Sequence, residues 1–279
     1  YDINLKEARL KELQKITLEP DVHFKFFKEN INDKSVMEKI FKKYNPEIVI
    51  NLAAQAGVRY SIENPSAYIQ TNLVGFSNIL ELSRNYPVKH LIYASSSSVY
   101  GGNTRMPFSE SQNVDHPVSL YAATKRANEL LAHSYSHLYS IPATGLRFFT
   151  VYGPWGRPDM ALFLFTKAII EGNPINVFNN GKMIRDFTYI DDVIESIYCL
   201  IDKLPIKENF SDKKNYNSSN SWAPYRIFNI GNSQPTNLNK YIKAIENNLN
   251  KKAEIILEEM QPGDVEKTYA DTANLEKLI

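Results

Sequence analysis

A tyrosine and a lysine four residues apart could act together in proton transfer. Tyr121 and Lys125 delimit the stretch Tyr-Ala-Ala-Thr-Lys, and on a helix this spacing places two side chains on one face, roughly 6 Å apart at Cβ. A tyrosine with an ordinary pKa of about 10 is a poor base at neutral pH until a fixed cation stabilises its phenolate. The pair therefore suits proton exchange with an alcohol, although the spacing alone is typical of a solvated helix face.

A run of serines upstream offers a third group for such a site. Ser95 to Ser98 follow the apolar stretch His-Leu-Ile-Tyr-Ala at 90–94. A serine hydroxyl that donates to the tyrosine oxygen would complete the arrangement. Without further context, serines after a strand are typical of turns in which they satisfy backbone groups.

The elements that must position these residues alternate along the first half of the chain. Ser119 is a plausible N-cap for a helix over 119–138 that carries the Tyr-Lys pair. Further helices are expected at 5–18, 35–44 and 65–84, and strands at 22–27, 47–54, 90–94 and 143–149. This alternation predicts an α/β fold with a doubly wound, Rossmann-type parallel sheet. Ligands of such sheets bind beyond the carboxyl ends of the strands.

The second half of the chain has shorter elements and a polar loop at 204–224. We expect residues 1–153 to form a nucleotide-binding domain of the Rossmann type. Residues 154–279 are expected to be mainly a smaller substrate-binding lobe, with some segments returning to the sheet.

Composition excludes several classes of function. The 279 residues carry a formal net charge of +1, which gives no electrostatic reason to expect nucleic acid or a membrane surface as a partner. The single cysteine, Cys199, suits a reducing compartment. No apolar run is long enough to span a bilayer, and the five histidines show no metal-binding spacing. We expect a cytoplasmic protein without a metal.

Six motifs follow one another along the chain: Asn51–Ser61, Ser96–Gly101, Tyr121–Lys125, Arg147–Pro154, Arg157–Met160 and Arg185–Asp192. In this order they resemble the extended short-chain dehydrogenase/reductases, which include the NAD-dependent epimerases and dehydratases. Among these the sequence is most similar to the UDP-glucuronate 4-epimerases, which the resemblance links to polysaccharide biosynthesis. The similarity runs over nearly the whole chain, which makes a chance match of the ordered motifs improbable.

The resemblance implies C4 epimerisation of UDP-glucuronate to UDP-galacturonate through a 4-keto intermediate, with tightly bound NAD. It makes Tyr121 the acid/base, Lys125 the group that lowers its pKa and holds the nicotinamide ribose, and Ser96 the donor to the 4-oxygen. The positions that the resemblance places at the cofactor are Asn30, Ile31, Leu52, Ala53, Ala54, Gln55, Asn72, Tyr121, Lys125 and Val151.

On the substrate side, the resemblance places Phe178 on uracil with Asn176 and Val177 beside it, Arg185 at the diphosphate, and Asp264 at the ribose. Thr150, Ser97 and Ser98 would hold the uronate carboxylate, with Arg157 and Arg59 supplying positive charge nearby. Taken singly, Phe178 is typical of a core residue, Arg157 and Arg59 of solvated charges, and Arg185 beside Asp186 of a surface ion pair.

The opening strand, glycine-rich turn and second strand of the family have no counterpart here. Glycine in that turn lets backbone amides approach a pyrophosphate. We therefore expect the chain to be a fragment of a longer protein. Roughly 35 residues in front of it would supply the strands and the turn that such a fold requires. A UDP-glucose/galactose 4-epimerase, another sugar-nucleotide enzyme and a catalytically silent UDP-sugar binder remain alternatives. The family also implies a homodimer that packs through the helices at 65–84 and 119–138.

Overall fold

The main sheet has four parallel strands in the order β1-β2-β3-β7. In the computed structural model, which describes residues 1–16, 23–209 and 216–279, these strands span Ile48–Asn51, His90–Ser96, Ala143–Phe148 and Tyr225–Ile230. Asn51 pairs with Tyr93, and Ser96 pairs with Phe148. The carboxyl ends of the strands therefore meet at one edge of the sheet.

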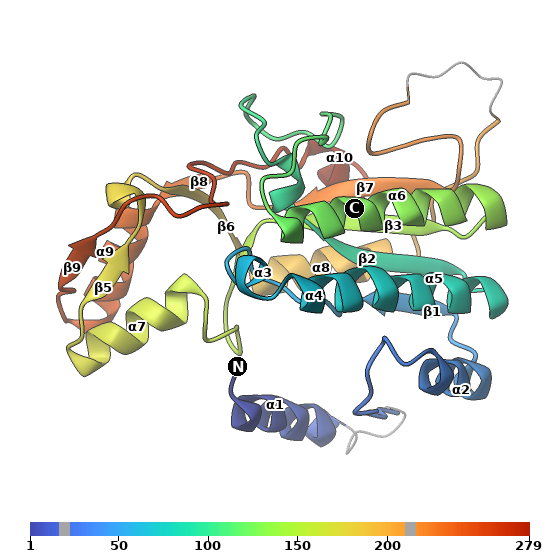
Figure 1. Ribbon diagram of the computed structural model, residues 1–279, viewed down its shortest axis with the longest axis horizontal. Coiled ribbons are helices and arrows are strands. Elements are labelled where there is room, and N and C mark those ends of the chain that lie inside the picture. Colours follow the sequence, from blue (N-terminus) through green and yellow to red (C-terminus); the bar gives the residue numbers. More distant parts are fainter. Residues whose placement is uncertain (17–22, 210–215) are drawn as a thin grey trace.

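Helices cover both faces of this sheet (Figure 1). Strand residues alternate between the faces, so Leu91 and Tyr93 of β2 join one core while Ile92 joins the other. The first core receives helices α2 (Lys34–Tyr44), α5 (Phe76–Asn85) and α6 (Leu120–Tyr139), and the second receives α8 (Ile190–Leu200) and α10 (Ala273–Glu276). The expected doubly wound α/β sheet is confirmed.

A second group of elements lies beside the main sheet, on the left in Figure 1. It contains a parallel pair, β5 (Ile175–Val177) with β9 (Ile255–Leu257), and a three-stranded sheet, β4-β6-β8. Helices α7 (Ala161–Glu171) and α9 (Leu238–Leu249) pack on an apolar core of their own. The strands of the three-stranded sheet are Thr150–Tyr152, Ile184–Tyr189 and Pro235–Asn237. Between β6 and β8 the chain returns to the main sheet as β7, and the domain boundary at 153/154 stays a prediction.

One expected strand is absent from the described residues. Val22 lies outside them, and His23 to Phe27 form no strand. The aromatic residues there suggested β structure, but a strand needs a partner, and no described strand runs beside this segment. Phe26 is 54% exposed, and Phe27 packs on the ring of Tyr44 at 5.5 Å between centroids. The prediction of a strand over residues 23–27 is therefore wrong.

The helix expected at 65–84 is present, but its middle turns are wider than an α-helix. Helix α4 (Pro65–Tyr68) continues through a π-helical segment, η1 (Ile69–Gly75), into α5. Helices α1 (Ile3–Ile16) and α3 (Tyr60–Glu63) and the 3-10 turns η2 (Ser97–Tyr100) and η3 (Asn179–Gly181) complete the described elements. Among the helices of the described residues, none is long and apolar enough to cross a bilayer.

Candidate functional site

Tyr121 stands in the first turn of α6, and the helix begins where the sequence predicts. The Ser119 hydroxyl caps it by accepting a hydrogen bond from the Ala122 amide at 3.1 Å. The Tyr121 ring is partly buried and meets the ring of Tyr68 edge-on, with 6.1 Å between centroids. Tyr68 in turn donates to the Gly57 carbonyl at 2.5 Å. The phenol therefore packs against a tyrosine that is itself fixed by a hydrogen bond.

Three neighbouring influences act on the pKa of the Tyr121 phenol. Burial raises it above its ordinary value, while the Ser96 hydroxyl and the Arg157 guanidinium lower it to a smaller extent. The groups that shift this pKa here do not include Lys125, and the expectation that Lys125 lowers it stays a prediction. Lys125 Nζ donates instead to the Ala94 carbonyl on β2, at 2.8 Å.

Lys125 is a buried cation, only 2% exposed. Burial lowers its pKa to about 8, and the negative charge of Glu129 acts in the opposite direction. An ammonium group with this pKa is still largely charged at neutral pH, yet it can lose its proton within a modest alkaline range. The Tyr-Lys pair therefore consists of a neutral phenol and a lysine that remains positive up to about pH 8.

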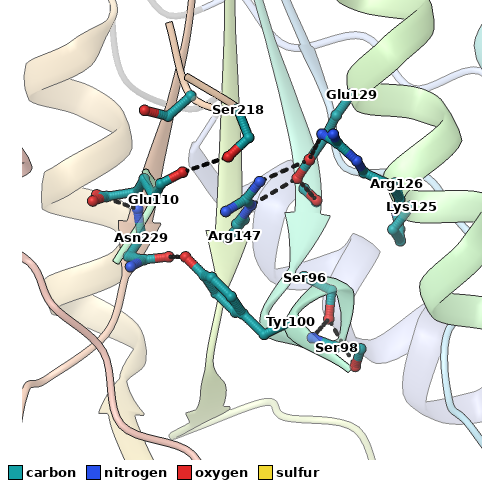
Figure 2. A network of polar contacts seen from close by, with 12 residues as sticks. Ser96, Ser98, Tyr100, Glu110, Lys125, Arg126, Glu129, Arg147, Ser218 and Asn229 are labelled. Atoms are coloured by element: carbon teal, nitrogen blue, oxygen red, sulfur yellow. Dashed lines mark hydrogen bonds and ion pairs between the residues drawn. The ribbon is translucent and has the colours of Figure 1, made fainter. Parts of the chain in front are cut away.

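Ser96 ends β2 at the same edge of the sheet. Its hydroxyl accepts from the Ser98 amide at 3.2 Å and donates to Ser98 Oγ at 3.1 Å, which starts the turn η2 (Figure 2). Gly101 closes this turn at φ +49°, where an added Cβ would lie 2.2 Å from the His116 carbonyl oxygen. The serines therefore do serve as turn residues, and the same turn presents Ser97 and Ser98 as partly buried hydroxyls.

Several residues expected at a cofactor gather beyond the end of β1. Leu52 is 50% exposed, and Ala53 beside it is also exposed. The Asn72 side chain accepts from the Gln55 amide at 2.8 Å and donates to the Gln55 carbonyl and to Thr124 Oγ1, each at 3.0 Å. Asn72 thus fixes the loop that follows β1, which includes Ala54, against helix α6.

The remaining expected cofactor residues belong to two other segments of the chain. Asn30 and Ile31 form a turn that is held by Asn78, whose amide donates to the Ile31 carbonyl at 2.9 Å. Val151 lies on β4, where it packs against the core under α8. Leu52 and Ala53 form an exposed apolar surface at the end of parallel strand β1, and Asn72 joins this loop to the helix that carries Lys125. Such a surface fits a nicotinamide dinucleotide.

Thr150 and Arg157, expected near a carboxylate, line one small cavity. Arg157 is paired with Asp159, through a 3.0 Å hydrogen bond from Nε and a second contact from Nη2. Despite this pairing, the Arg157 charge lowers the pKa of Tyr121. The positive charge is therefore close enough to act on the phenol.

The expected uridine residues come together on the side of the smaller lobe. The Arg59 guanidinium lies over the Phe178 ring, 4.4 Å from its centroid, and Arg59 Nη2 approaches Asp264 Oδ2 at 3.5 Å. Arg185 donates to the carbonyls of Ile184 and Glu266, at 3.0 Å each. These contacts thus join the start of α3, the residue after β5 and strand β6 with the segment at 264–266.

Asn176 and Val177 point in different directions. Asn176 is exposed, whereas the Val177 side chain is fully buried in the core of the smaller lobe. The Val177 carbonyl is engaged by the Glu258 amide at 3.0 Å. The structure therefore does not bring the Val177 side chain to the site.

A buried ion pair next to the site was not singled out from the sequence. Glu129 and Arg147, both 0% exposed, form a two-pronged contact with both N···O distances at 2.9 Å (Figure 2). Glu129 lies four residues after Lys125, as Lys125 does after Tyr121. This spacing was the available signal, because it places all three side chains along one side of the helix.

A parallel α/β sheet with tyrosine, lysine and serine side chains at the carboxyl ends of its strands defines the extended short-chain dehydrogenase/reductase class. Residues 5–219 match the model of the NAD dependent epimerase/dehydratase family, and the chain belongs to this family. The predicted family is thereby confirmed.

Several known proteins are similar over almost the whole chain. Protein CapI of Staphylococcus aureus is 54% identical over 275 residues, covering 99% of this chain and 80% of that protein. A probable UDP-glucuronate 4-epimerase of Rhizobium meliloti is 47% identical over 279 residues, covering 100% and 80%. The structure of UDP-glucuronic acid 4-epimerase from Bacillus cereus, in complex with UDP-glucuronic acid and NAD, superposes with a TM-score of 0.81 at 31% identity, covering 97% of this chain and 80% of that one.

Proposed function

We propose that this chain catalyses the C4 epimerisation of UDP-glucuronate and UDP-galacturonate with NAD. The observation that carries the proposal is the joint placement of Tyr121, Lys125 and Ser96 at the carboxyl edge of the sheet. Relatives named UDP-glucuronate 4-epimerase support the substrate class, and the Bacillus cereus structure holds UDP-glucuronic acid together with NAD.

In this proposal Tyr121 Oη exchanges the proton of the sugar 4-hydroxyl, and Ser96 donates a hydrogen bond to the same sugar oxygen. Lys125 keeps a positive charge near the phenol, so that the anionic form of Tyr121 costs less when the proton leaves the sugar. The chemistry that NAD supplies when bound is reversible hydride acceptance at C4. Residues proposed to hold it are Asn30, Ile31, Leu52, Ala53, Ala54, Gln55, Asn72, Lys125 and Val151.

The uronate carboxylate is assigned to the hydroxyls of Thr150, Ser97 and Ser98, with Arg157 supplying positive charge. The position of this carboxylate matters because a 4-ketouronate is a β-keto acid. Such an acid loses CO2 when the carboxylate turns perpendicular to the neighbouring carbonyl. Hydroxyls that fix its plane would therefore protect the intermediate as well as bind the substrate.

The nucleotide is assigned to the other side of the cleft. Arg185 suits the diphosphate, because a guanidinium binds phosphate oxygens through paired donors. Phe178 and Asp264 are proposed for uracil and ribose, with Asn176 and the backbone at Val177 beside them. Arg59 covers the Phe178 ring, so it must share that face with the base or move from it.

The test is incubation of the purified protein with UDP-glucuronate, followed by anion-exchange chromatography of the sugar nucleotides. We expect UDP-galacturonate to accumulate. The Tyr121→Phe variant should lose on the order of 10²- to 10⁴-fold in rate, the usual contribution of a general acid/base. Its UDP-glucuronate affinity should change little, because only one hydroxyl is removed.

Parallel reactions with UDP-glucose decide between the alternatives. Turnover of UDP-glucose without turnover of UDP-glucuronate would replace the proposed substrate. Failure to convert either sugar, in protein that carries NAD, would leave a sugar-nucleotide binder without this activity.

We further propose that the protein works in the cytoplasm as a homodimer, packed through the α4-η1-α5 rod and helix α6. Apolar side chains exposed on these helices support this assembly: Val74 is 40% exposed, Leu130 54% and Leu138 65%. Sedimentation equilibrium checks the proposal, and Leu130→Glu with Leu138→Glu should yield monomers.

A further inference from the structure

Glu129 receives hydrogen bonds from three different side chains although it is fully buried. Ser95 Oγ donates to Oε1 at 2.6 Å, and Arg126 Nη1 donates to Oε2 at 3.0 Å. Arg147 supplies two more, from Nε and Nη2, at 2.9 Å each. Both oxygens of this carboxylate are therefore occupied by donors from the helix itself and from two strands. Figure 2 shows the contacts with Arg126 and Arg147.

The donors come from segments that also carry the candidate catalytic groups. Ser95 immediately precedes Ser96 on β2. Glu129 follows Lys125 by one helical turn, and Lys125 follows Tyr121 by another. The carboxylate thus joins the helix that carries the tyrosine to the strand that carries the serine.

Arg147 extends the same connection to the serine turn. Its guanidinium lies over the Tyr100 ring, 4.9 Å from the centroid, and Tyr100 ends the turn that contains Ser97 and Ser98. The Tyr100 hydroxyl donates to Asn229 Oδ1 on β7 at 2.7 Å. Strand β7 is thereby fastened to the turn as well (Figure 2).

We propose that Glu129, held by Arg147 and Ser95, is the positioning residue that fixes the Tyr121–Lys125 face of helix α6 against the Ser96 turn. This inference rests on the proposed function for its kinetic readouts. Proton transfer depends on the distances between Tyr121, Lys125 and Ser96, because a shift of 1 Å in a reacting group can cost on the order of 10²-fold in rate. A buried ion pair with two direct hydrogen bonds restricts such shifts, because any alternative arrangement leaves a charge unpaired.

Glu129 also contributes its charge. It raises the pKa of Lys125, which burial lowers to about 8. The other titratable groups that face Glu129 are Arg147 on β3, Arg126 on α6, Tyr93 on β2 and Tyr225 on β7. Arg147 is in turn faced by Tyr100 of η2. All of these tyrosines have raised pKa values and are neutral at neutral pH, so Glu129 is the anion of this group that acts on Lys125.

Two variants separate position from charge. Ser95→Ala removes the hydrogen bond between β2 and Glu129 but leaves every charge in place. We expect kcat to fall roughly tenfold with KM changed less than about twofold, the pattern of an interaction needed for the transition state. The phenolate titration of Tyr121, obtained as the ultraviolet difference from the matching Tyr121→Phe protein, should move to higher pH because Ser96 no longer stabilises the anion.

Glu129→Gln removes the charge as well. Its kcat should fall further, and the alkaline limb of the kcat profile should move down by roughly one pH unit, because Lys125 loses an opposite charge. Should this variant fail to fold, Ser95→Ala decides the matter alone.

Glu81→Gln is the matched control. Glu81 on α5 accepts from the Tyr135 hydroxyl of α6 at 2.6 Å, so it fastens the same helix at its far end. This variant should melt at a lower temperature and keep the wild-type kcat profile. An equal kcat loss in Glu81→Gln would overturn the inference, and so would a Ser95→Ala protein with wild-type kcat and Tyr121 titration. If wild-type protein does not convert UDP-glucuronate while Ser95→Ala still shifts the Tyr121 titration, the positioning role stands and the proposed function falls.

Discussion

Lys125 combines a positive charge with almost complete burial. Its pKa of about 8 lies below the ordinary 10.5 because burial disfavours the charged form. The group is therefore charged below pH 8 and neutral above it. In the proposed reaction this charge favours the Tyr121 anion, so kcat should fall as pH rises through about 8, and a steady-state pH profile measures this.

The same shift has a consequence for stability. Between pH 8 and 10.5 the unfolded chain keeps a proton on Lys125 that the native state has released, so this group makes the native state more stable as pH rises. Lys125→Met removes the effect. In urea unfolding, Lys125→Met should therefore have a larger free energy of unfolding than the wild type at pH 7. This difference should shrink toward higher pH. A constant difference would contradict the lowered pKa.

At the scale of residues, spacing was enough to predict the Tyr121–Lys125 pair and the Ser119 cap, because both follow from the geometry of one helix. The direction of Lys125 Nζ could not be predicted in this way. Its acceptor is a backbone carbonyl, Ala94 O, on another element, and any residue type can supply a carbonyl. The spacing of Glu129 was visible in the sequence, but its burial and its pairing with Arg147 were not, because Arg147 lies on a strand rather than on the same helix.

Helix α6 is the element on which the candidate site depends most, since Tyr121 stands in its first turn. Ser119→Ala removes the cap on the Ala122 amide and should cost about 1 kcal/mol of unfolding free energy. Because fraying at this end moves the phenol, kcat should fall as well. Urea unfolding and turnover measured on one preparation check both effects.

Asn237→Ala provides the comparison, because Asn237 caps α9 by accepting from the Asn239 amide at 2.8 Å. This helix belongs to the smaller lobe and carries none of the proposed site residues. A similar loss of stability without a loss of kcat is expected. Equal kcat losses in the two variants would show that the position of the cap is irrelevant.

At the scale of elements, periodicity predicted most helices and strands but not their irregularities. The π-helical turns of η1 are stabilised by contacts of Asn72 with Gln55 and Thr124, which join three separate segments. The expected strand at 22–27 was wrong over its described residues for the same kind of reason. A strand depends on its partner, which local sequence does not specify.

The two groups of strands are connected through Asp186 on β6. This carboxylate is fully buried and accepts from the amides of Asn232, Ser233 and Ala270, at 2.7, 3.1 and 3.0 Å. The surface ion pair that Arg185 and Asp186 suggest when taken singly is therefore not what the structure contains. The fold class followed from the sequence, but this connection could not, because its donors are backbone amides from the loop after β7 and from the C-terminal segment.

Asp186→Ala should destabilise the whole molecule by at least about 3 kcal/mol, because three buried amides lose a charged acceptor. Asp191→Ala, in the same motif but exposed in the first turn of α8, should cost less than about 1 kcal/mol. Chemical denaturation followed by circular dichroism compares them. A small effect of Asp186→Ala would mean that water replaces the carboxylate at little cost.

The two ion pairs near the site differ in their access to solvent. Neither member of Glu129–Arg147 is exposed, whereas Arg59 and Asp264 are 51% and 18% exposed. Dissolved ions screen exposed charges over about 8 Å at physiological ionic strength but reach buried pairs much less. Ionic strength should therefore act on the two kinetic constants separately. Added salt should raise KM for the sugar nucleotide and leave kcat nearly constant. In a cell with a high salt concentration the enzyme would therefore bind its substrate more weakly but convert bound substrate at the same rate.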